Sequence, residues 1–576
     1  EYQRPGEEAI EGSRISKRAA AEVFPETMPL YLETGAPARW IRFILDHPLR
    51  ARVESLPPVE SALKSKEFAG FLAGLGLVQF YMGMDWEASL ETLAGRGAAF
   101  GMDPSSGSVG GVFLSSRPER LPKLYQGLLR LADPNREGTV QQGEYRGQKA
   151  YALGKQLFLI PFEDRVFVST QKPMVKQMAD YWLDSPKKNL SRRVAFMAAR
   201  ESRGDRTVWS YAHLKTLRDS GWAPDLFAEK TDNIAVELLM GGLLEATRNA
   251  ETLTGGVNLQ TDRIEVSFQT AWDERAIPGP RAFFFGSPQE REKFKRLQLE
   301  GTLGEVHAFR DIGKLWLSKE DLFEEAHLAE LSQADSTLST LFSGLDFGEE
   351  VLGSTKPGFQ ILARNQDYTK LETPRPDIRI PEFAIVLRLK ESDRIQRRLR
   401  IAYQSFIGFL NIQLAMENNP QLELESETMG KNRIVSATYF PDEEDGYPGL
   451  IHYNFSPSIG FADDWFVISS TRKLARDLVA AASRGEVVRD PGTNTSIRIA
   501  GKNLHGILGQ NSEPLIAQNM LEEGNDRDEA KSQVELLLGV VDWIEQVSLE
   551  LGQGKEMLNL TFGLQLDFSD TQTSPR

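Results

Sequence analysis

The sequence predicts an α+β fold built as a tandem duplication, with two related halves. Each half is expected to hold a largely antiparallel, curved sheet with helices packed on one face. Three observations predict this: short motifs recur in the same order along the chain, strand-like segments alternate apolar and polar residues, and helix-like runs follow several of them. At 576 residues the chain also exceeds what one hydrophobic core usually organises.

The clearest repeat pairs "DRVFVSTQKPMVKQMAD" (164–180) with "DWFVISSTRKLARDLVA" (464–480). Both contain a strand-like run, a pair of hydroxyl residues and a helix-like run. Five more pairs follow in the same order, and the partners in all six pairs lie 261 to 300 residues apart. Duplication followed by loop insertions produces such a drifting offset. The five further pairs are 83–95 with 344–353, 111–131 with 384–403, 143–154 with 427–439, 207–221 with 495–510, and 262–270 with 556–564.

The repeats predict a first half at 23–275 and a second half at 300–569. A linker at 276–299 is expected between them, because Pro278, Gly279, Pro280 and Gly286 are residues typical of connecting segments. Residues 1–22 form an N-terminal extension in this interpretation. The polar segment 570–576 is expected to be a frayed tail.

Local patterns indicate the element types within each half. "IEVSFQT" (264–270) and "LNLTFGLQLD" (558–567) alternate as antiparallel strands with one solvated face do. Helices are expected to begin at the hydroxyl pairs Ser169/Thr170 and Ser469/Ser470. The uncharged run Phe68–Met84 and the apolar run 237–246 are expected to be buried helical segments. An alternative is that they line an apolar cavity between sheet and helices.

Charge and hydrophobic run length disfavour two classes of protein, those that bind nucleic acid or anionic membranes and those that span a membrane. The chain has 82 acidic and 67 basic residues, a net charge of −15, which disfavours nucleic acid and anionic membranes as partners. The run Phe68–Met84 is shorter than the ~20 residues of a membrane span, so a soluble protein without a transmembrane segment is expected.

The chain has no cysteine, which excludes disulfides, thiolate metal sites and cysteine nucleophiles. This absence fits an exported protein that avoids stray oxidation. Residues 1–22 contain neither methionine nor an apolar signal region, so they are interpreted as what remains after a signal peptide was removed. A periplasmic or extracellular location follows as an expectation.

Several stretches support a resemblance, among them "EVFPETMPLYLE", "ILDHPLR", "KTDNIAVELLMGGLLEATRNA", "DSTLSTLFSGLDFGEEVLG", "IVSATYF", "IHYNFSPS" and "AQNMLEEG". Over nearly the whole chain after residue 22, the sequence resembles an uncharacterised family of exported bacterial proteins, known only as a domain of unknown function. The resemblance implies export and a bacterial source. It implies no activity and no site residues.

Two S-x-x-K patterns, Ser169 with Lys172 and Ser470 with Lys473, match the spacing of serine acyl-enzymes. The alternative is a hydroxyl at a helix start beside a solvated lysine. This alternative is favoured because Ser169 aligns with Ser469 rather than with Ser470, so the lysine shifts by one position between the halves.

Two charged segments suggest ligands. The loop 441–449 offers Asp442, Glu444 and Asp445 to calcium, but it lacks the ligand order of an EF-hand, and a solvated insertion is the alternative. Arg394, Arg397 and Arg398 could meet an anionic partner, or lie on an ordinary amphipathic surface helix. No motif indicates a cofactor, and no two of the six histidines have zinc-ligand spacing.

We therefore expect an exported, non-enzymatic binding or assembly protein. Its partner would be another protein or a cell-envelope polymer, and a homo-oligomer is possible. The first alternative is a carrier of an apolar small ligand, which predicts a continuous apolar cavity between sheet and helices. The second is a serine hydrolase that uses an S-x-x-K junction, which predicts a serine beside a lysine in a cleft.

Overall fold

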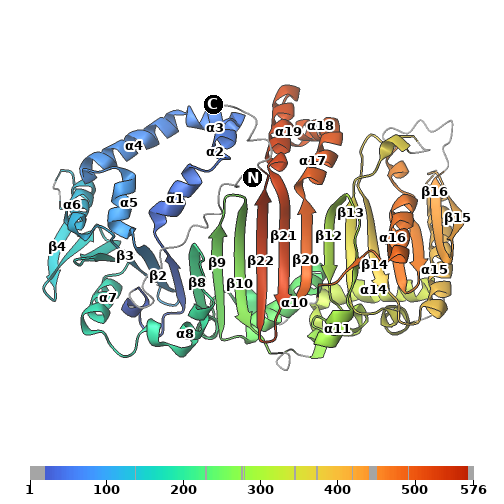
Figure 1. Cartoon of the computed structure of the whole chain (residues 1–576), viewed down its shortest axis with the longest axis horizontal. Coiled ribbons are helices and arrows are strands. Elements are labelled where there is room, and N and C mark those ends of the chain that lie inside the picture. The colour runs from blue at the N-terminus through green and yellow to red at the C-terminus, as the bar shows by residue number, and fades with distance from the viewer. Residues whose placement is uncertain are drawn as a thin grey trace, which may run out of the picture. The chain divides into compact units, whose positions relative to one another are not determined.

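The computed structural model describes residues 20–567 apart from the segment 440–449 and several short gaps. These gaps are 136–137, 228–229, 232, 274–276, 278, 343–345, 371–373, 418 and 491. The described chain forms two compact units: unit 1 comprises 20–227 and 247–271, and unit 2 comprises 228–246 and 272–567. Both units combine helices with antiparallel strands, which confirms the predicted α+β class (Figure 1).

The sheet of unit 1 has the strand order β10-β9-β8-β1-β2-β3-β7-β6-β5-β4, and all of these pairs are antiparallel. The hairpin β4–β5 turns at Arg146 and Gly147, whose φ angles of 50° and 79° are those that a two-residue hairpin requires. The strands are β1 (Leu30–Thr34), β2 (Gly97–Asp103), β3 (Ser108–Leu114), β4 (Val140–Tyr145), β5 (Gln148–Leu153), β6 (Leu157–Pro161), β7 (Arg165–Ser169), β8 (Val208–His213), β9 (Thr252–Leu259) and β10 (Arg263–Ala271).

The main sheet of unit 2 is also antiparallel, in the order β22-β21-β20-β12-β13-β14-β18-β17-β16-β15. The short strands β11 (Arg296–Leu297) and β19 (Val487–Val488) form a separate pair. The strands of the main sheet are β12 (Thr302–Ala308), β13 (Phe359–Arg364), β14 (Glu382–Arg388), β15 (Leu422–Met429), β16 (Asn432–Tyr439), β17 (Ser458–Ala462), β18 (Trp465–Ser469), β20 (Thr493–Ala500), β21 (Ile544–Gln553) and β22 (Met557–Leu566).

The two strand orders are the same when β1–β7 are replaced by β12–β18 and β8–β10 by β20–β22. The repeated sequence pairs fall on equivalent elements of the two orders. For example, 164–180 forms β7 and most of α7 (Lys172–Asp184), and 464–480 forms β18 and most of α16 (Arg472–Arg484). Asp85 and Asp346 each accept a hydrogen bond from the backbone N–H three residues later, at Ala88 and Glu349.

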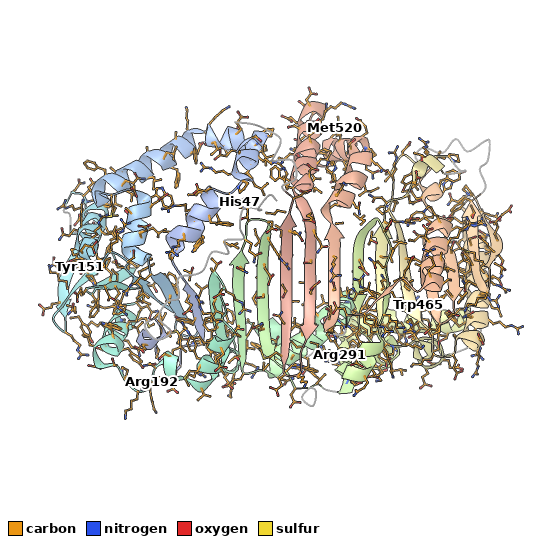
Figure 2. The ribbon with its side chains drawn as sticks, viewed as in Figure 1. His47, Tyr151, Arg192, Arg291, Trp465 and Met520 are labelled. Atoms are coloured by element: carbon orange, nitrogen blue, oxygen red, sulfur yellow. The ribbon has the colours of Figure 1, made fainter. Side chains whose placement is uncertain are left out.

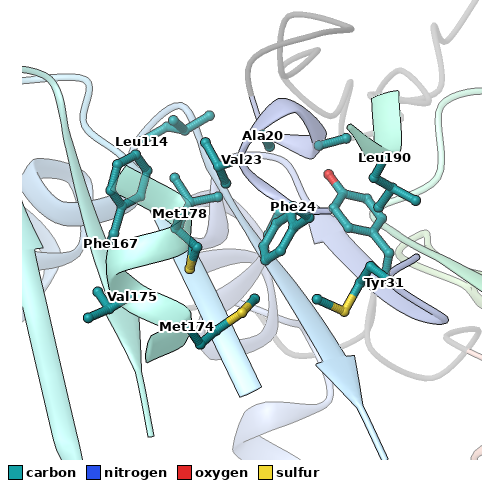
Figure 3. Close-up of a cluster of buried hydrophobic side chains, with 14 of the residues drawn as sticks. Ala20, Val23, Phe24, Tyr31, Leu114, Phe167, Met174, Val175, Met178 and Leu190 are labelled. Carbon is teal, nitrogen blue, oxygen red and sulfur yellow. The ribbon is translucent and has the colours of Figure 1, made fainter. Parts of the chain in front are cut away.

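Among the described residues of unit 1, helices pack on the sheet around three clusters of buried side chains. In the first, Phe24 and Tyr31 meet Phe167 of β7 and Met174 and Met178 of α7 (Figure 3). The helices are η1 (Ala21–Val23), α1 (Pro37–Leu45), α2 (Arg50–Glu54), α3 (Pro57–Leu63), α4 (Lys66–Met82), α5 (Trp86–Ala94), η2 (Pro118–Arg120), α6 (Leu121–Ala132), α7, η3 (Leu190–Arg192), α8 (Val194–Glu201), α9 (Leu214–Asp219) and η4 (Pro224–Phe227).

In unit 2, α16 packs on one face of the sheet through Leu474, Leu478 and Val479, against Val467 and Trp465 (labelled in Figure 2). The helix α10 (Ile234–Asn249) belongs to this unit up to residue 246. The others are η6 (Gly279–Arg281), α11 (Pro288–Lys293), α12 (Ile312–Leu317), α13 (Lys319–Leu322), α14 (Glu325–Leu341), η7 (Phe347–Val351), η8 (Leu352–Ser354), η9 (Tyr368–Lys370), α15 (Ser392–Met416), η10 (Ile451–Asn454), α17 (Gly501–Gln510), α18 (Ser512–Glu523) and α19 (Arg527–Asp542).

The expected burial of Phe68–Met84 is wrong, although the helix itself forms as α4. Phe71 and Phe80 are 63% and 80% exposed, and only the C-terminal end of the helix packs, where Met82 meets α6. Gly127 of α6 permits this contact, because a Cβ there would lie 2.5 Å from the carbonyl oxygen of Tyr81. Within the described part of the chain, no helix has the length and apolar character needed to cross a membrane.

The boundaries of the predicted halves also need correction. The segment 228–246, expected in the first half, belongs to unit 2. The described part of 276–299 is no exposed linker, since Phe283 and Phe284 are fully buried in the core of unit 2. The predicted extension 1–22 ends in buried residues, because Ala20 and Ala21 pack in the core of unit 1. Residues 1–19 and the tail 570–576 lie outside the described residues.

His307 on β12 is a buried histidine whose charge state affects the stability of unit 2. It is 2% exposed, and its Nε2 atom has no hydrogen-bond partner in the described part of the chain. Burial, with smaller contributions from Arg296 and Arg498, lowers the pKa of His307 to about 3. The folded protein therefore keeps this ring neutral, whereas the unfolded chain protonates it below its ordinary pKa of about 6.5.

We predict that His307→Leu reduces the pH dependence of unfolding. Since the unfolded state binds the extra proton, this group's contribution to stability is complete above pH 6.5 and is lost as the pH falls toward 3. Between pH 7 and pH 5 the loss is about 2 kcal/mol. Urea unfolding at both pH values should show this difference between wild type and His307→Leu. His505→Leu, at a partly exposed histidine, should keep the wild-type slope. Equal slopes in wild type and His307→Leu would contradict the prediction.

Candidate functional site

Unit 2 contains an apolar cavity of about 340 Å³ between its sheet and its helices. Strands β14, β18 and β17 form one side, and α14, α15 and the turns η7 and η8 form the other. Successive side chains of a strand point to opposite faces of a sheet. On β18, Phe466 and Ile468 line the cavity, whereas Val467 packs beneath α16 on the opposite face. The cavity therefore lies on the face of the sheet opposite α16. Because α15 packs on that face and α16 on the other, the predicted packing of helices on one face alone is wrong for unit 2.

One stripe of α15 forms a wall of the cavity. Leu399, Ala402, Tyr403 and Phe406 occupy positions i, i+3, i+4 and i+7, which places them on one side of a helix. The Tyr403 hydroxyl donates a hydrogen bond to the Pro457 carbonyl at 2.6 Å, which ties the helix to the segment before β17. Burial raises the pKa of Tyr403, so this wall carries no phenolate charge at neutral pH.

Aromatic side chains form the opposite wall. Phe342, after α14, and Phe347 of η7 have ring centroids 5.7 Å apart, and Trp316 of α12 packs edge-on against Phe347 at 5.2 Å. Asp346 fixes the start of η7, where its carboxylate accepts a hydrogen bond from the Glu349 N–H at 2.6 Å. The aromatic wall is therefore held by the Asp346 cap of η7 and by the packing of the Trp316 ring from α12.

The polar side chains at the cavity have internal partners. The Ser354 hydroxyl donates to the Val351 carbonyl at 2.6 Å, and the Thr355 hydroxyl donates to the Leu352 carbonyl at 2.7 Å. A buried water needs two to four polar partners, so a cavity of this kind holds apolar atoms better than water. The arrangement suits binding of an apolar group, and none of the described residues that line the cavity carries a charged side chain.

The cavity opens onto a row of apolar side chains that crosses the sheet. Residues that face each other in neighbouring strands lie on the same face of a sheet. Ile361, Ile385 and Ile468 are 37%, 38% and 41% exposed, and Ile468 also lines the cavity. In order across the strands, the row is Ile459, Ile468, Ile385, Ile361, Val306, Ile497, Leu549 and Phe562.

The equivalent region of unit 1 is a packed core. Helix α6 stands in the place of α15 but spans 12 residues rather than 25. Its Leu121 and Leu124 pack with Met82, Leu159 and Val166 in one buried cluster. Side chains of unit 1 therefore occupy the space that corresponds to the cavity of unit 2.

Unit 1 has a different apolar hollow of about 380 Å³ on its sheet. Leu32, Phe100 and Phe268 line it, and Leu32 and Phe268 are 39% and 42% exposed. Ser210 and Gly255 lie between these apolar side chains in the strand register. The hollow is lined by strands, without a helical wall such as α15 provides in unit 2.

The first S-x-x-K pair is not brought together as a catalytic pair. The Ser169 hydroxyl donates to the Val109 carbonyl at 2.7 Å and accepts from the Gln171 N–H at 3.0 Å. Lys172 is exposed, and within the described part of the chain no hydrogen bond joins it to Ser169. The predicted helix start shifts as well, because the N-cap residue of α7 is Gln171.

The second pair is separated in a similar way. Ser470 is buried, and its hydroxyl accepts a hydrogen bond from the Phe383 N–H at 2.8 Å. Lys473 forms an ion pair with Asp477, with 2.7 Å between Nζ and Oδ2. The N-cap of α16 is Thr471, which accepts from the Leu474 N–H at 3.1 Å. These serines therefore bind the backbone around the strand-to-helix junctions.

We predict that Ser169→Ala lowers the free energy of unfolding by about 1 kcal/mol, because two backbone hydrogen bonds are lost. Lys172→Ala should change it by less than about 0.5 kcal/mol, as at most exposed positions. Urea unfolding measures both effects. Neither Ser169 nor Ser470 should react with a fluorophosphonate probe, since the hydrogen bonds that the structure gives each hydroxyl join it to backbone groups. Covalent labelling of either serine, detected by mass spectrometry, would contradict this assignment.

The predicted calcium residues Asp442, Glu444 and Asp445 lie outside the described residues. Among the residues that the structure describes, no three histidine or acidic side chains are grouped so that they could hold a metal ion.

Comparisons with known proteins add little to this picture. No protein-family model matches the chain, and no curated protein matches it. Solved structures of TP0453 align with parts of the chain at 10% identity and a TM-score of 0.24. Crystal form IV covers 44% of this chain and 80% of that one, and crystal form III covers 49% and 90%. Likeness at this level carries no argument about fold or function.

Proposed function

We propose that the protein is an exported, non-enzymatic binding protein that carries an apolar small molecule in the cavity of unit 2. The observation that carries this proposal is the cavity itself: about 340 Å³, lined by aliphatic and aromatic side chains, with its hydroxyl groups bonded to carbonyls of the chain. Ligand sites are typically concave and mostly apolar, with volumes of roughly 300 to 1,000 Å³.

Export and a tandem duplication are part of the same proposal. The absence of cysteine supports export. The common strand order and the positions of the repeated segments support descent of both units from one ancestral unit. A duplicated unit frees one copy to diverge, and unit 2 differs from unit 1 by its longer α15 and by the cavity beside it.

The proposal is tested with a neutral apolar probe, N-phenyl-1-naphthylamine, whose fluorescence rises in apolar surroundings. The full chain, stripped of bound lipid, should bind it saturably with one probe per chain, and dodecanol should displace it. Leu32→Ser alters the apolar hollow of unit 1 and should leave this titration unchanged. The absence of saturable binding would refute the proposal, and its loss in Leu32→Ser would move the site to unit 1.

A further inference from the structure

A polar pocket of about 250 Å³ adjoins the apolar cavity at the start of α15. The two hollows share Ser354. The charged side chains that line the polar pocket are Lys390, Arg394, Arg398, Glu349, Glu350 and Glu391. Together, the two adjoining hollows are therefore polar at one end and apolar at the other, as a ligand with a polar head and an apolar tail would require.

Helix α15 connects the two hollows. Ile395 lines the polar pocket, and Leu399, one turn later, lines the apolar cavity. Both side chains belong to one buried cluster. Arg394 and Arg398 are also one turn apart, so the helix carries two guanidinium groups beside the pocket at the point where its apolar stripe begins.

The donors of these two arginines are not used by the described part of the chain. Arg394 Nη1 lies 3.8 Å from Glu391 Oε2, and Arg398 Nη1 lies 3.9 Å from Glu350 Oε1. At these distances the groups form ion pairs but no hydrogen bond. Glu350 instead accepts a hydrogen bond from the Asp346 N–H at 3.1 Å. Lys390, in contrast, already donates to the Gly353 carbonyl at 2.8 Å.

The following inference rests on the proposed function. We propose that the ligand is a single-chain amphiphile with an anionic head group. Its chain fills the apolar cavity, and its carboxylate or phosphate accepts hydrogen bonds from Arg394 and Arg398. Guanidinium groups match both oxyanions in planar geometry. The cavity volume of about 340 Å³ lies in the range of sites that hold small ligands.

The acidic residues of the polar pocket affect how it can select an anionic head group. Three carboxylates and three basic groups line it, so its net charge is close to zero and its field gives little general attraction for anions. Selectivity then comes from directed hydrogen bonds of the two arginines. Because the Arg394 and Arg398 side chains are 70% and 37% exposed, their effect is modest, about fivefold in affinity.

The experiment is displacement of N-phenyl-1-naphthylamine from the full chain by four compounds with the same chain: dodecanol, dodecanoate, dodecyl phosphate and dodecyltrimethylammonium, each below its micelle concentration. Dodecanoate or dodecyl phosphate should bind about fivefold more tightly than dodecanol, and the stronger of the two identifies the head group. Dodecyltrimethylammonium, which accepts no hydrogen bond, should show no such gain.

The matched variants are Arg394→Gln/Arg398→Gln and, as a control, Arg397→Gln. Arg397 is exposed on the same helix and lines neither hollow. The double variant should lose the advantage of the anionic heads and keep its affinity for dodecanol, whereas Arg397→Gln should behave as wild type. Thermal unfolding confirms that each variant is folded.

Equal binding of dodecanol and both anionic compounds to the wild type would overturn the head-group inference and leave the proposed function standing. The same conclusion follows if the double variant keeps the anionic preference, or if Arg397→Gln loses it equally. Failure of the probe and of dodecanol to bind at all would refute the proposed function together with this inference.

Discussion

Ala402→Phe is expected to abolish most ligand binding by filling the cavity of unit 2. Ala402 lies on the stripe of α15 that lines the cavity and is 4% exposed, so an added ring enters space that the ligand would occupy. Competition between ring and ligand should cost about 1–3 kcal/mol of binding free energy, which is about 5- to 150-fold in affinity. Titration with N-phenyl-1-naphthylamine measures the loss.

The matched control is Ala415→Phe, the same substitution at an exposed position of the same helix. It should bind the probe as wild type does. The free energy of unfolding of Ala402→Phe should stay within about 1 kcal/mol of wild type, because the ring enters a void rather than a packed core. Unchanged affinity in a folded Ala402→Phe protein would show that the probe binds elsewhere.

Arg281→Met is expected to destabilise unit 2 by about 3–5 kcal/mol. Arg281 forms ion pairs with Glu237 at 2.9 Å and Glu245 at 2.6 Å, and the side chains of both glutamates are almost fully buried. Burial lowers the pKa of Arg281, but the two carboxylates outweigh it, and the pKa is raised overall. Removing the guanidinium group leaves two carboxylates without this charge partner in the core, which is the costly state.

Two comparisons separate this mechanism from simple loss of packing. The triple variant Arg281→Met/Glu237→Gln/Glu245→Gln should recover part of the stability, since it removes the buried charges as well. Lys531→Met, which breaks an exposed pair with Glu535 at 3.7 Å, should cost at most about 0.5 kcal/mol. Urea unfolding monitored by tryptophan fluorescence measures all three. A loss below 1 kcal/mol in Arg281→Met would contradict the role assigned to the network.

The features that the sequence predicted well are local ones. Strand alternation at 264–270 and 558–567 corresponds to β10 and β22, because a half-solvated strand imposes a period of two on its residues. The repeated segments at 164–180 and 464–480 form equivalent strand–helix units. Such patterns depend on neighbours in the chain and are therefore visible before the fold is known.

Whether a segment is buried depends on which elements pack against it in the fold, and the sequence does not show these elements. An uncharged run usually packs in a core, yet α4 extends beyond α6 and exposes Phe71 and Phe80. Proline and glycine usually mark linkers, yet Phe283 and Phe284 anchor the predicted linker in unit 2. In both cases the tertiary neighbours decided the outcome, not the local composition.

The sequence predicted an apolar cavity as one possible kind of site, but not the residues that line it. An apolar cavity between sheet and helices was one of the alternatives, but Phe68–Met84 and 237–246, the segments expected to line it, are not among its lining residues. The lining comes from α14, η7, η8, α15 and three strands between 382 and 469. A cavity is the space left between elements, so it depends on the spacing of helices, which residue patterns do not encode. Arg394, Arg397 and Arg398 were offered to an anionic partner, with an ordinary amphipathic surface helix as the alternative, and the sequence did not show the polar pocket beside Arg394 and Arg398.

Native mass spectrometry of the protein purified gently from its own source tests the central claim most directly. We expect a mass above 64.5 kDa by a few hundred daltons, lost on denaturation and absent from Ala402→Phe prepared in the same way. A chain that carries no such mass, while fatty acids and alkyl phosphates are abundant in the same extract, would contradict the claim that unit 2 is a carrier.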